Sequence, residues 1–227
     1  MIHQNNASTK KNKKPWPTKA AMEQVYEKKL WGGGDQVNFY SGEGSHSAEI
    51  VAPYIAAVGA FLKTFKKPLI VCDLGCGDFN IGKQLVEYTK HYVAVDIVPD
   101  LIAHNKTSFI AENLTFHCLD IALDALPSGD CAIVRQVLQH VSNAEVQRIV
   151  DKLYDFKYVI ITEHLPNGIF EPNKDLISGQ GIRLKKQSGI NLLASPFNMV
   201  VKEKKELVSV ALDNNKGVIV TTLYTIY

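Results

Sequence analysis

Short apolar runs that end in polar residues recur along the middle of this sequence, with helix-like segments between them. The runs are LIVCDLG (69–75), HYVAVD (91–96), LTFHCLD (114–120), CAIVRQ (131–136) and YVIIT (158–162). Continuous apolar runs of this length are typical of strands that are buried on both faces of a parallel sheet. Strands that alternate with helices need right-handed crossovers. The sequence therefore predicts an α/β fold with a doubly wound, mostly parallel sheet.

The C-terminal stretch follows a different pattern. In ELVSVALDNNKGVIVTTLYTIY, the turn sequence DNNKG lies between two runs rich in β-branched residues. This arrangement is a hairpin signal. We therefore expect the last two strands to be antiparallel, which completes a seven-stranded sheet.

Helix signals lie between the strands and before them. Helices are predicted over 81–88 (IGKQLVEY) and 99–107 (PDLIAHNKT), the second with a proline near its start. The sequence SNAE (142–145) predicts a capping box that opens a further helix. Upstream, a helix is expected from Pro17 to the glycines of WGGG (31–34), and a more apolar one over 48–65.

The chain divides into three predicted parts. Residues 1–14 are polar and lysine-rich, which predicts a disordered basic tail. Residues 15–66 form N-terminal helices joined by the loop FYSGEGSHS (39–47), which we interpret as a flexible lid. Residues 67–227 form the main domain, and their length suits one domain of ordinary size.

Composition narrows the class of function. The formal net charge is +2 in 227 residues, which gives no electrostatic case for nucleic acid or membrane binding. No run is apolar enough to span a bilayer, and the N-terminus lacks the apolar middle of a signal peptide. We therefore expect a cytoplasmic protein. The four cysteines form no C-x-x-C pair. Those at 72, 118 and 131 lie within apolar, strand-like runs, so we interpret the cysteines as buried, reduced thiols.

Polar side chains follow each predicted parallel strand. They are Asp73 and 75–78, Asp96, Asp120, Arg135 with Gln136, and Glu163 with His164. In an open α/β sheet, ligands bind beyond the carboxyl ends of the strands near the switch point. The sequence thus predicts a ligand site at this edge.

The residue types at that edge select the ligand. Asp96 lies about twenty residues beyond the glycines, a spacing at which a carboxylate can bind ribose hydroxyls. Asn80 stands where a dinucleotide fold has its third glycine, and Asp78 would repel a pyrophosphate. A carboxylate at Asp73 is likewise suited to an ammonium or sulfonium group. This charge pattern favours S-adenosylmethionine (SAM) over a nicotinamide dinucleotide.

The motifs DLGCGD (73–78), VAVD (93–96) and LDI (119–121), together with the closing hairpin, resemble the class I SAM-dependent methyltransferases over residues 67–227. The segments WGGG, SGEGS, RQVLQH and PFN (196–198) look like a bacterial subset of that family whose members mostly lack an assigned substrate. One departure is Phe79, which stands where the family often has a glycine.

The resemblance implies a role for each cofactor residue. Asp73, Gly75, Cys76 and Gly77 would lie around the methionine portion, and Asp96 would hold the ribose. Ile97 would lie against the adenine. Asp120 would accept from the exocyclic amine, and Ile121 would donate through its backbone. Asp73, Asp96 and Asp120 could instead be turn-forming acids. Tyr40, Ser41, Gly42 and Ser45 of the lid are expected at SAM, and His46 at the acceptor. Arg135, with Gln136, is assigned to the cofactor group, either on the SAM carboxylate or in a salt bridge to Asp73 or Asp78.

Two histidines are candidates for a catalytic base. His140 lies four residues after Gln136, a spacing that puts both on one side of a helical turn. His164 follows Glu163 at the end of a strand. Either histidine could instead be structural, and a metal held by Glu163, His164 and His140 is the less favoured reading, so no metal is assigned.

The predicted reaction is methyl transfer from SAM to a small-molecule acceptor such as a sugar or metabolite hydroxyl, with S-adenosylhomocysteine as product. RNA or protein acceptors stay open, because the lysine tail and residues 174–186 carry local positive charge. A non-catalytic SAM-binding module is the other class of function. The stretch 165–197 is interpreted as the acceptor-binding insertion. The acceptor and the oligomeric state are not fixed by the sequence.

Overall fold

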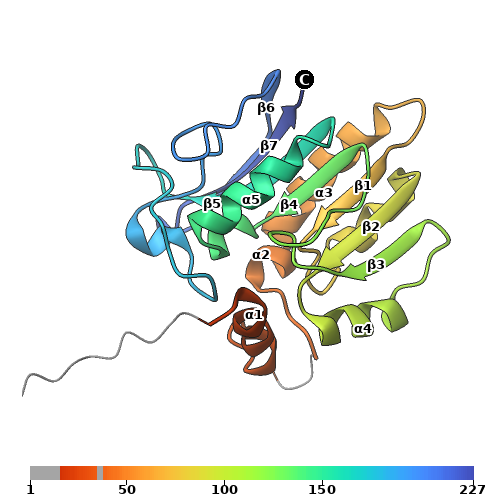
Figure 1. The fold of residues 1–227 in the computed structure, drawn as a ribbon, viewed down its shortest axis with the longest axis horizontal. Helices are drawn as coiled ribbons and strands as arrows, with labels where there is room; N and C mark the ends of the chain where they lie inside the picture. The colour runs from red at the N-terminus through yellow and green to blue at the C-terminus, as the bar shows by residue number, and fades with distance from the viewer. Residues whose placement is uncertain (1–15, 35–37) are drawn as a thin grey trace, which may run out of the picture.

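A computed structural model describes residues 16–34 and 38–227, and it shows one twisted sheet with helices on both faces (Figure 1). The strands are β1 Ile70–Leu74, β2 His91–Asp96, β3 Leu114–Cys118, β4 Cys131–Arg135, β5 Tyr158–Leu165, β6 Glu203–Ala211 and β7 Val218–Thr225. The helices are α1 Thr18–Glu27, α2 Glu43–His46, α3 Ala48–Lys63, α4 Pro99–Ser108 and α5 Asn143–Leu153. Short 3₁₀ turns are η1 Gly82–Gln84, η2 Val86–Tyr88, η3 Leu138–His140 and η4 Arg183–Lys186.

The seven strands lie in the order β3-β2-β1-β4-β5-β7-β6. Strands β1 to β5 run parallel to one another, whereas β7 runs antiparallel to both β5 and β6. The predicted fold class and the closing antiparallel hairpin are therefore confirmed. The chain leaves β1 toward β2 on one side and returns to β4 on the other. This switch point opens a crevice at the carboxyl ends of β1 and β4.

Each face of the sheet has its own apolar core. On one face, Val146, Ile149 and Val150 of α5 pack with side chains of β1, β4 and β5. On the other face, Tyr54 and Val58 of α3 pack with the residues that alternate with those in the strands. The alternation of side chains along each strand supplies both cores. Helix α3 therefore belongs to the same core as the sheet.

Local signals place several boundaries where the sequence predicted them. The Ser142 side chain accepts from the Glu145 backbone N–H, and the Glu145 carboxylate accepts from the Ser142 N–H, so the capping box is confirmed. In the β6–β7 turn, Asn214, Asn215 and Gly217 all have positive φ. These are the residue types that adopt left-handed conformations at least cost.

Three local predictions are wrong. Residues 81–88 form η1 and η2 rather than one helix. The ring of Phe79 packs directly on Gly82, where a Cβ would lie 2.3 Å from the ring. Cys118 is exposed, because it is the last residue of β3, which lies at the edge of the sheet. The lid segment 39–47 is not wholly a loop, since it contains α2.

Two further findings concern the chain ends and membranes. The predicted basic tail, 1–14, lies outside the described residues. Among the helices of residues 16–34 and 38–227, none combines the length and apolar character that crossing a bilayer requires.

Candidate functional site

The loop that follows β1 turns back sharply on glycines. Gly75 and Gly77 have φ of 96° and 55°, and the N–H groups of Gly75 and Cys76 both donate to the Val95 carbonyl. A Cβ on Gly75 would lie 2.3 Å from Cγ2 of Val137. A side chain is therefore excluded there on two counts. The backbone of this loop is left bare on its open side.

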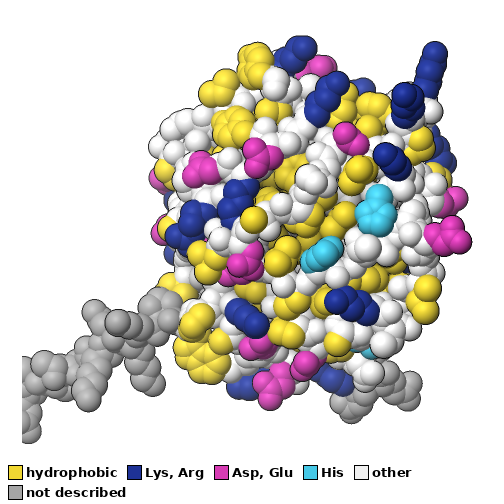
Figure 2. Space-filling model, turned by 45° about the vertical axis from the view of Figure 1, so that its right-hand side comes forward, with side chains coloured by type: hydrophobic (Ala, Val, Ile, Leu, Met, Phe, Trp, Pro, Cys, Tyr) yellow, Lys and Arg dark blue, Asp and Glu magenta, His cyan; other side chains and the backbone are white. Residues whose placement is uncertain are grey.

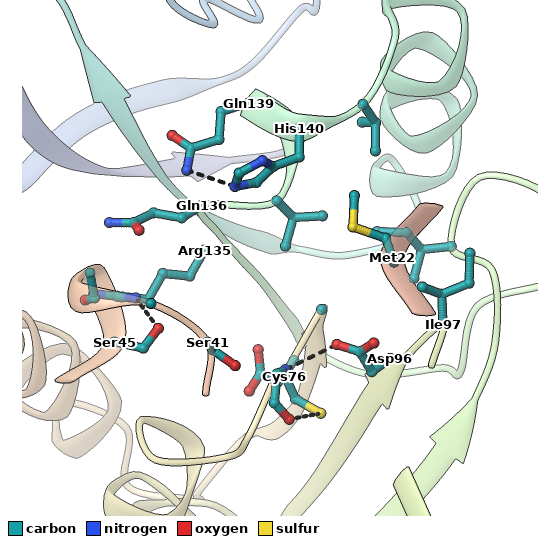
Figure 3. A pocket seen from close by; sticks show the side chains of 18 of the residues that line it. Met22, Ser41, Ser45, Cys76, Asp96, Ile97, Arg135, Gln136, Gln139 and His140 are labelled. Carbon is teal, nitrogen blue, oxygen red and sulfur yellow. Dashed lines mark hydrogen bonds between the residues drawn. The ribbon is translucent and has the colours of Figure 1, made fainter. Parts of the chain in front are cut away.

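That open side is the floor of a cavity of about 380 Å³ at the carboxyl ends of β1, β2 and β4 (Figure 3). The predicted site residues that line it are Ser41, Asp73, Gly75, Cys76, Gly77, Asp96, Ile97, Asp120, Ile121, Arg135, Gln136 and His140. Gly42 and Ser45 of the lid segment line it as well. Three predicted residues, Tyr40, His46 and His164, do not. The size suits a small-molecule ligand.

Asp96 ends β2 and faces the glycine loop. Its Oδ2 accepts from the Gly77 N–H at 3.0 Å, and its Oδ1 accepts from the Val98 N–H at 3.1 Å. Each carboxylate oxygen has two lone pairs, so both retain capacity for a ligand. Burial raises the pKa of this carboxyl despite the backbone donors.

Asp73 lies deeper, at the end of β1. The Tyr92 hydroxyl donates to its Oδ2 at 2.9 Å. Burial raises its pKa to about 7, although the tyrosine hydrogen bond and the positive charge of Arg135 act in the opposite direction. A buried carboxyl with so high a pKa gains much from a cationic ligand, which would replace the lost solvation.

Asp120 serves as a turn former and also lines the cavity. Its Oδ1 accepts from the Ala122 N–H at 2.8 Å, and its own N–H donates to Asp124 at 2.8 Å. The turn-forming role that the sequence suggested is therefore found, and the residue also lies where a cavity ligand could reach it. The neighbouring Ile121 also lines the cavity, and its carbonyl accepts from Lys152 at 3.0 Å.

Arg135 ends β4 and reaches under the lid segment. Its guanidinium donates to the Gly44 carbonyl and, at 3.3 Å, to the Ser45 hydroxyl, and it lies 4.8 Å from the centre of the Tyr54 ring. The alternative salt bridge to Asp73 or Asp78 is not formed. Oδ2 of Asp78 instead lies 2.6 Å from Nε2 of His46. The Nε of Arg135 is buried without a partner.

The lid segment 39–47 is fastened to the glycine loop through Asp78. Oδ2 of Asp78 accepts from the Ser41 N–H at 2.8 Å and pairs with Nε2 of His46 at 2.6 Å. The Asp78 N–H donates back to the Ser41 hydroxyl at 2.8 Å, and that hydroxyl also contacts the Tyr26 hydroxyl at 3.0 Å. Asp78 therefore closes the lid and does not line the cavity.

The same fastening explains the position of Tyr40 and His46. Their rings stack with centroids 4.3 Å apart, and the Tyr40 hydroxyl donates to Glu43 at 2.7 Å. Both side chains are thereby held within the lid. The expectation that His46 faces an acceptor is not met, because its Nε2 is engaged by Asp78 and it does not line the cavity.

The two candidate bases differ in position. His140 lines the cavity, and its ring lies 5.1 Å from that of Trp31. Burial lowers its pKa to about 4, so the imidazole is neutral near pH 7. His164 lies outside the cavity, where its Nε2 contacts the Lys216 carbonyl at 2.6 Å. Only His140 is therefore placed to meet a ligand in this cavity.

Several lining residues were not identified from the sequence. They are Thr18, Met22 and Tyr26 of α1, Trp31 after it, and Gln180, Ile182 and Lys185 of the 165–197 stretch, all brought to the cavity by tertiary packing. The apolar spacing of α1 indicated only a helix face. The charged stretch 174–186 also differs from expectation. Arg183 is 1% exposed and donates to the carbonyls of Leu138 and Val141, so it is a buried anchor.

Comparison with known proteins finds one family model that matches part of the chain. Residues 71–156 match the family model of a methyltransferase domain. No curated protein matches the sequence.

The solved structures similar to this one share its fold. A human N-acetylserotonin methyltransferase in complex with SAM has a TM-score of 0.58 and 16% identity, over 93% of this chain and 60% of that one. An N-methyltransferase from Bradyrhizobium japonicum with bound S-adenosylhomocysteine has a TM-score of 0.64 and 10% identity, over 90% of this chain and 98% of that one. A magnesium protoporphyrin IX methyltransferase from Synechocystis with bound SAM has a TM-score of 0.58 and 15% identity, over 95% of this chain and 100% of that one. This chain thus spans less than two thirds of the human enzyme, and identities this low indicate the fold alone.

Proposed function

We propose that this protein is a SAM-dependent methyltransferase that acts on a hydroxyl group of a small-molecule acceptor. The observation that carries the proposal is the cavity at the switch point. A bare glycine loop and three carboxylates line it, within a segment that matches a methyltransferase domain. The lining residues combine the charges that an adenosyl sulfonium ligand requires.

The residues present fit that cofactor. Asp96 retains acceptor capacity for two ribose hydroxyls, and Asp120 lies on the lining with Ile121 for the edge of an adenine ring. Asp73 offers a buried carboxylate to an ammonium group. The carboxylate of the methionine portion needs donors, and Nε of Arg135 and Nε2 of Gln136 are buried without partners in this part of the cavity. Unpartnered buried donors are costly unless a ligand satisfies them.

Bound SAM supplies an electrophilic methyl group on a sulfur that leaves readily. The protein's own contribution is alignment of the acceptor, exclusion of water and removal of a proton. His140 is the residue that we assign to proton removal, because its imidazole is neutral and lines the cavity. The lid fastened through Asp78 and the 178–186 segment shut out water on opposite sides.

The acceptor side of the cavity favours a small molecule. It is lined by Met22, Trp31, Gln180, Ile182 and Lys185, so apolar and aromatic side chains stand beside a single amine. Figure 2 shows positive and negative side chains mixed around a hydrophobic centre on one face, with no continuous basic surface. A nucleic-acid substrate needs such a surface. Two of the similar structures are named for small-molecule acceptors, N-acetylserotonin and magnesium protoporphyrin IX.

Isothermal titration calorimetry tests the cofactor assignment. We expect S-adenosylhomocysteine to bind and NAD not to bind. The substitution Asp96→Ala should abolish S-adenosylhomocysteine binding while the thermal transition is retained, whereas Asp213→Ala, in the exposed β6–β7 turn, should bind normally. Unchanged affinity in Asp96→Ala would refute the ribose assignment.

An acceptor panel then separates an enzyme from a binding module. Release of S-adenosylhomocysteine is measured with hydroxylated sugars and phenols as acceptors. The assigned base is supported if the native protein methylates any acceptor in the panel and His140→Ala does not, while His140→Ala keeps its affinity for S-adenosylhomocysteine. Cofactor binding without turnover across broad panels of hydroxyl, amine and thiol acceptors would favour the non-catalytic module.

A further inference from the structure

The side chain of Gln139 lies between a backbone donor and the ring of His140. Its Oε1 accepts from the His164 N–H at 3.3 Å, and its Nε2 is 3.2 Å from Nε2 of His140. Figure 3 shows this second contact at the wall of the cavity, where both side chains are part of the lining. Gln139 is 6% exposed, so water does not readily replace either contact.

The backbone donor fixes the orientation of the amide. A backbone N–H can only donate, so the group of Gln139 that faces His164 must be the carbonyl oxygen. A reversed amide would place two donors against each other in a buried site, which is costly. The amide NH₂ is thereby directed at His140.

An amide NH₂ can only donate, and this decides which ring nitrogen of His140 carries the proton. Nε2 of His140 must accept, so the neutral ring is protonated on Nδ1. Nδ1 of His140 is buried and has no hydrogen-bond partner, so the Gln139 contact alone carries the tautomer assignment. Backbone groups of Gly181, Gly179 and Gln180 lie beside the ring and act to raise the His140 pKa against the larger effect of burial. The Gly179 N–H holds that segment on the His140 carbonyl at 3.0 Å.

We propose that Gln139 is a positioning residue that holds His140 in the Nδ1–H tautomer, so that Nε2 carries the lone pair that accepts a proton from the methyl acceptor. This rests on the proposed function for its purpose, although the tautomer itself does not. At 3.2 Å the amide contact is long for a hydrogen bond. An acceptor hydroxyl can replace it.

The proton balance follows from this arrangement. The acceptor hydroxyl gives its proton to Nε2 as its oxygen bonds to the methyl carbon, and the sulfur keeps the electron pair of the broken bond. The ring becomes an imidazolium with protons on both nitrogens. It returns to the Nδ1–H form by losing the Nε2 proton to water after product release.

Nitrogen-15 NMR of the cofactor-free protein tests the tautomer directly, because protonated and unprotonated ring nitrogens have well-separated chemical shifts. We expect His140 in the native protein to be protonated at Nδ1 and unprotonated at Nε2 near pH 7. His140→Ala assigns the signals. A His140 signal protonated at Nε2 would overturn the proposal.

Gln139→Glu is the decisive variant. A carboxylate still accepts from the His164 N–H, but it presents a second acceptor to Nε2, so His140 should acquire a proton there. We expect methyl transfer to fall about 100-fold while S-adenosylhomocysteine affinity stays within about twofold. An unchanged tautomer and unchanged rate in Gln139→Glu would refute the role.

A control and a second variant separate positioning from folding. His164→Ala keeps the backbone N–H that orients Gln139, so it should retain the native tautomer and rate. Gln139→Met removes both contacts with little change in volume, and should give a mixture of tautomers. A wholly Nδ1–H signal in Gln139→Met would show that Gln139 is not needed. If the native protein does not bind S-adenosylhomocysteine, that result contradicts the proposed function. The tautomer measurement stays valid in that case, because it does not depend on the ligand.

Discussion

At the residue scale, the site contains carboxyl groups that are buried, where their charged forms are poorly solvated. Asp73 and Asp96 are 5% and 8% exposed, and burial raises the pKa of both carboxyls. The folded chain keeps them because backbone and tyrosine donors offset part of the cost. A cation between them would offset more. The cost of burying these groups is therefore coupled to ligand binding.

The pKa of Asp73 predicts how cofactor affinity depends on pH. Its pKa is raised to about 7 from an ordinary value of 3.8. Without ligand, this raised pKa stabilises the fold fully below about pH 4, and the contribution is lost as the pH rises through 7. An ammonium ligand needs the carboxylate, so binding must release a proton below pH 7. We expect S-adenosylhomocysteine affinity to fall toward tenfold per pH unit on going from pH 7 to pH 5.5.

Calorimetry in buffers of different ionisation enthalpy measures that proton release. His140 contributes little over this range, because its pKa is about 4. Asp73→Asn removes the titrating group, so its affinity should be lower at pH 7.5 and nearly independent of pH. Equal pH dependence in the native protein and in Asp73→Asn would assign the proton to another group.

Phe79 shows what sequence can and cannot predict at one position. The missing glycine of the motif was visible, but its structural meaning was not. Phe79 adopts φ of 62° and is fully buried against Tyr92, Phe109 and Phe116. The aromatic packing offsets the backbone strain of about 1 kcal/mol that a side chain meets there. Such compensation depends on distant residues, so it is not encoded locally.

At the element scale, local signals specified the strands and α5 well. The apolar runs and the Ser142–Glu145 capping box are short-range patterns, and the structure confirms them. The failures lie where tertiary contacts overrule local pattern, as in η1 and η2 beneath Phe79 and in α2 within the lid. Helix α2 is short and is held by Asp78, a residue more than thirty positions away in the sequence.

The lid yields a prediction about ligand exchange. His46 contacts Asp78 at 2.6 Å from within α2. His46→Ala removes that pair but leaves the Ser41 contacts to Asp78 in place, so the fold should lose no more than about 1 kcal/mol. We expect S-adenosylhomocysteine to dissociate several-fold faster because the lid opens more often, as stopped-flow competition would measure.

A matched control lies in the same segment. Tyr40→Phe removes the hydroxyl contact to Glu43 and keeps the ring stacked on His46. It should leave the dissociation rate unchanged. If both variants release ligand at the native rate, the lid does not limit exchange.

At the scale of the whole molecule, the cavity is assembled from parts of the chain that are far apart in sequence. The glycine loop and the strand ends supply the cofactor side, which sequence motifs predicted. Helix α1, Trp31 and the 178–186 segment supply the other side. No motif marked these residues, although the length of the 165–197 stretch had suggested an acceptor-binding insertion. Motifs report chemistry that many proteins share. The acceptor side depends on how long loops fold over the sheet, and that requires the structure.

Arg183 joins the 178–186 segment to the turn that follows β4. Its guanidinium donates to the Leu138 and Val141 carbonyls and to the Asn143 side chain at 2.7 to 2.8 Å, and Glu163 lies close enough to raise its pKa against the effect of burial. These acceptors surround η3, which carries Gln139 and His140. Removing the guanidinium therefore leaves several buried carbonyls unpaired beside the assigned base.

We expect Arg183→Met to lower the free energy of unfolding by about 3 kcal/mol, because it also leaves Glu163 buried without its cation. Both oxygens of Glu163 lack hydrogen-bond partners, and its pKa of about 8 means that it can take up a proton instead. The loss should therefore be smaller at pH 6 than at pH 9. Urea denaturation at both pH values measures this, with the exposed neighbour Lys186→Met as control. A loss that is equal at both pH values would mean that Glu163 does not depend on Arg183 for its charge.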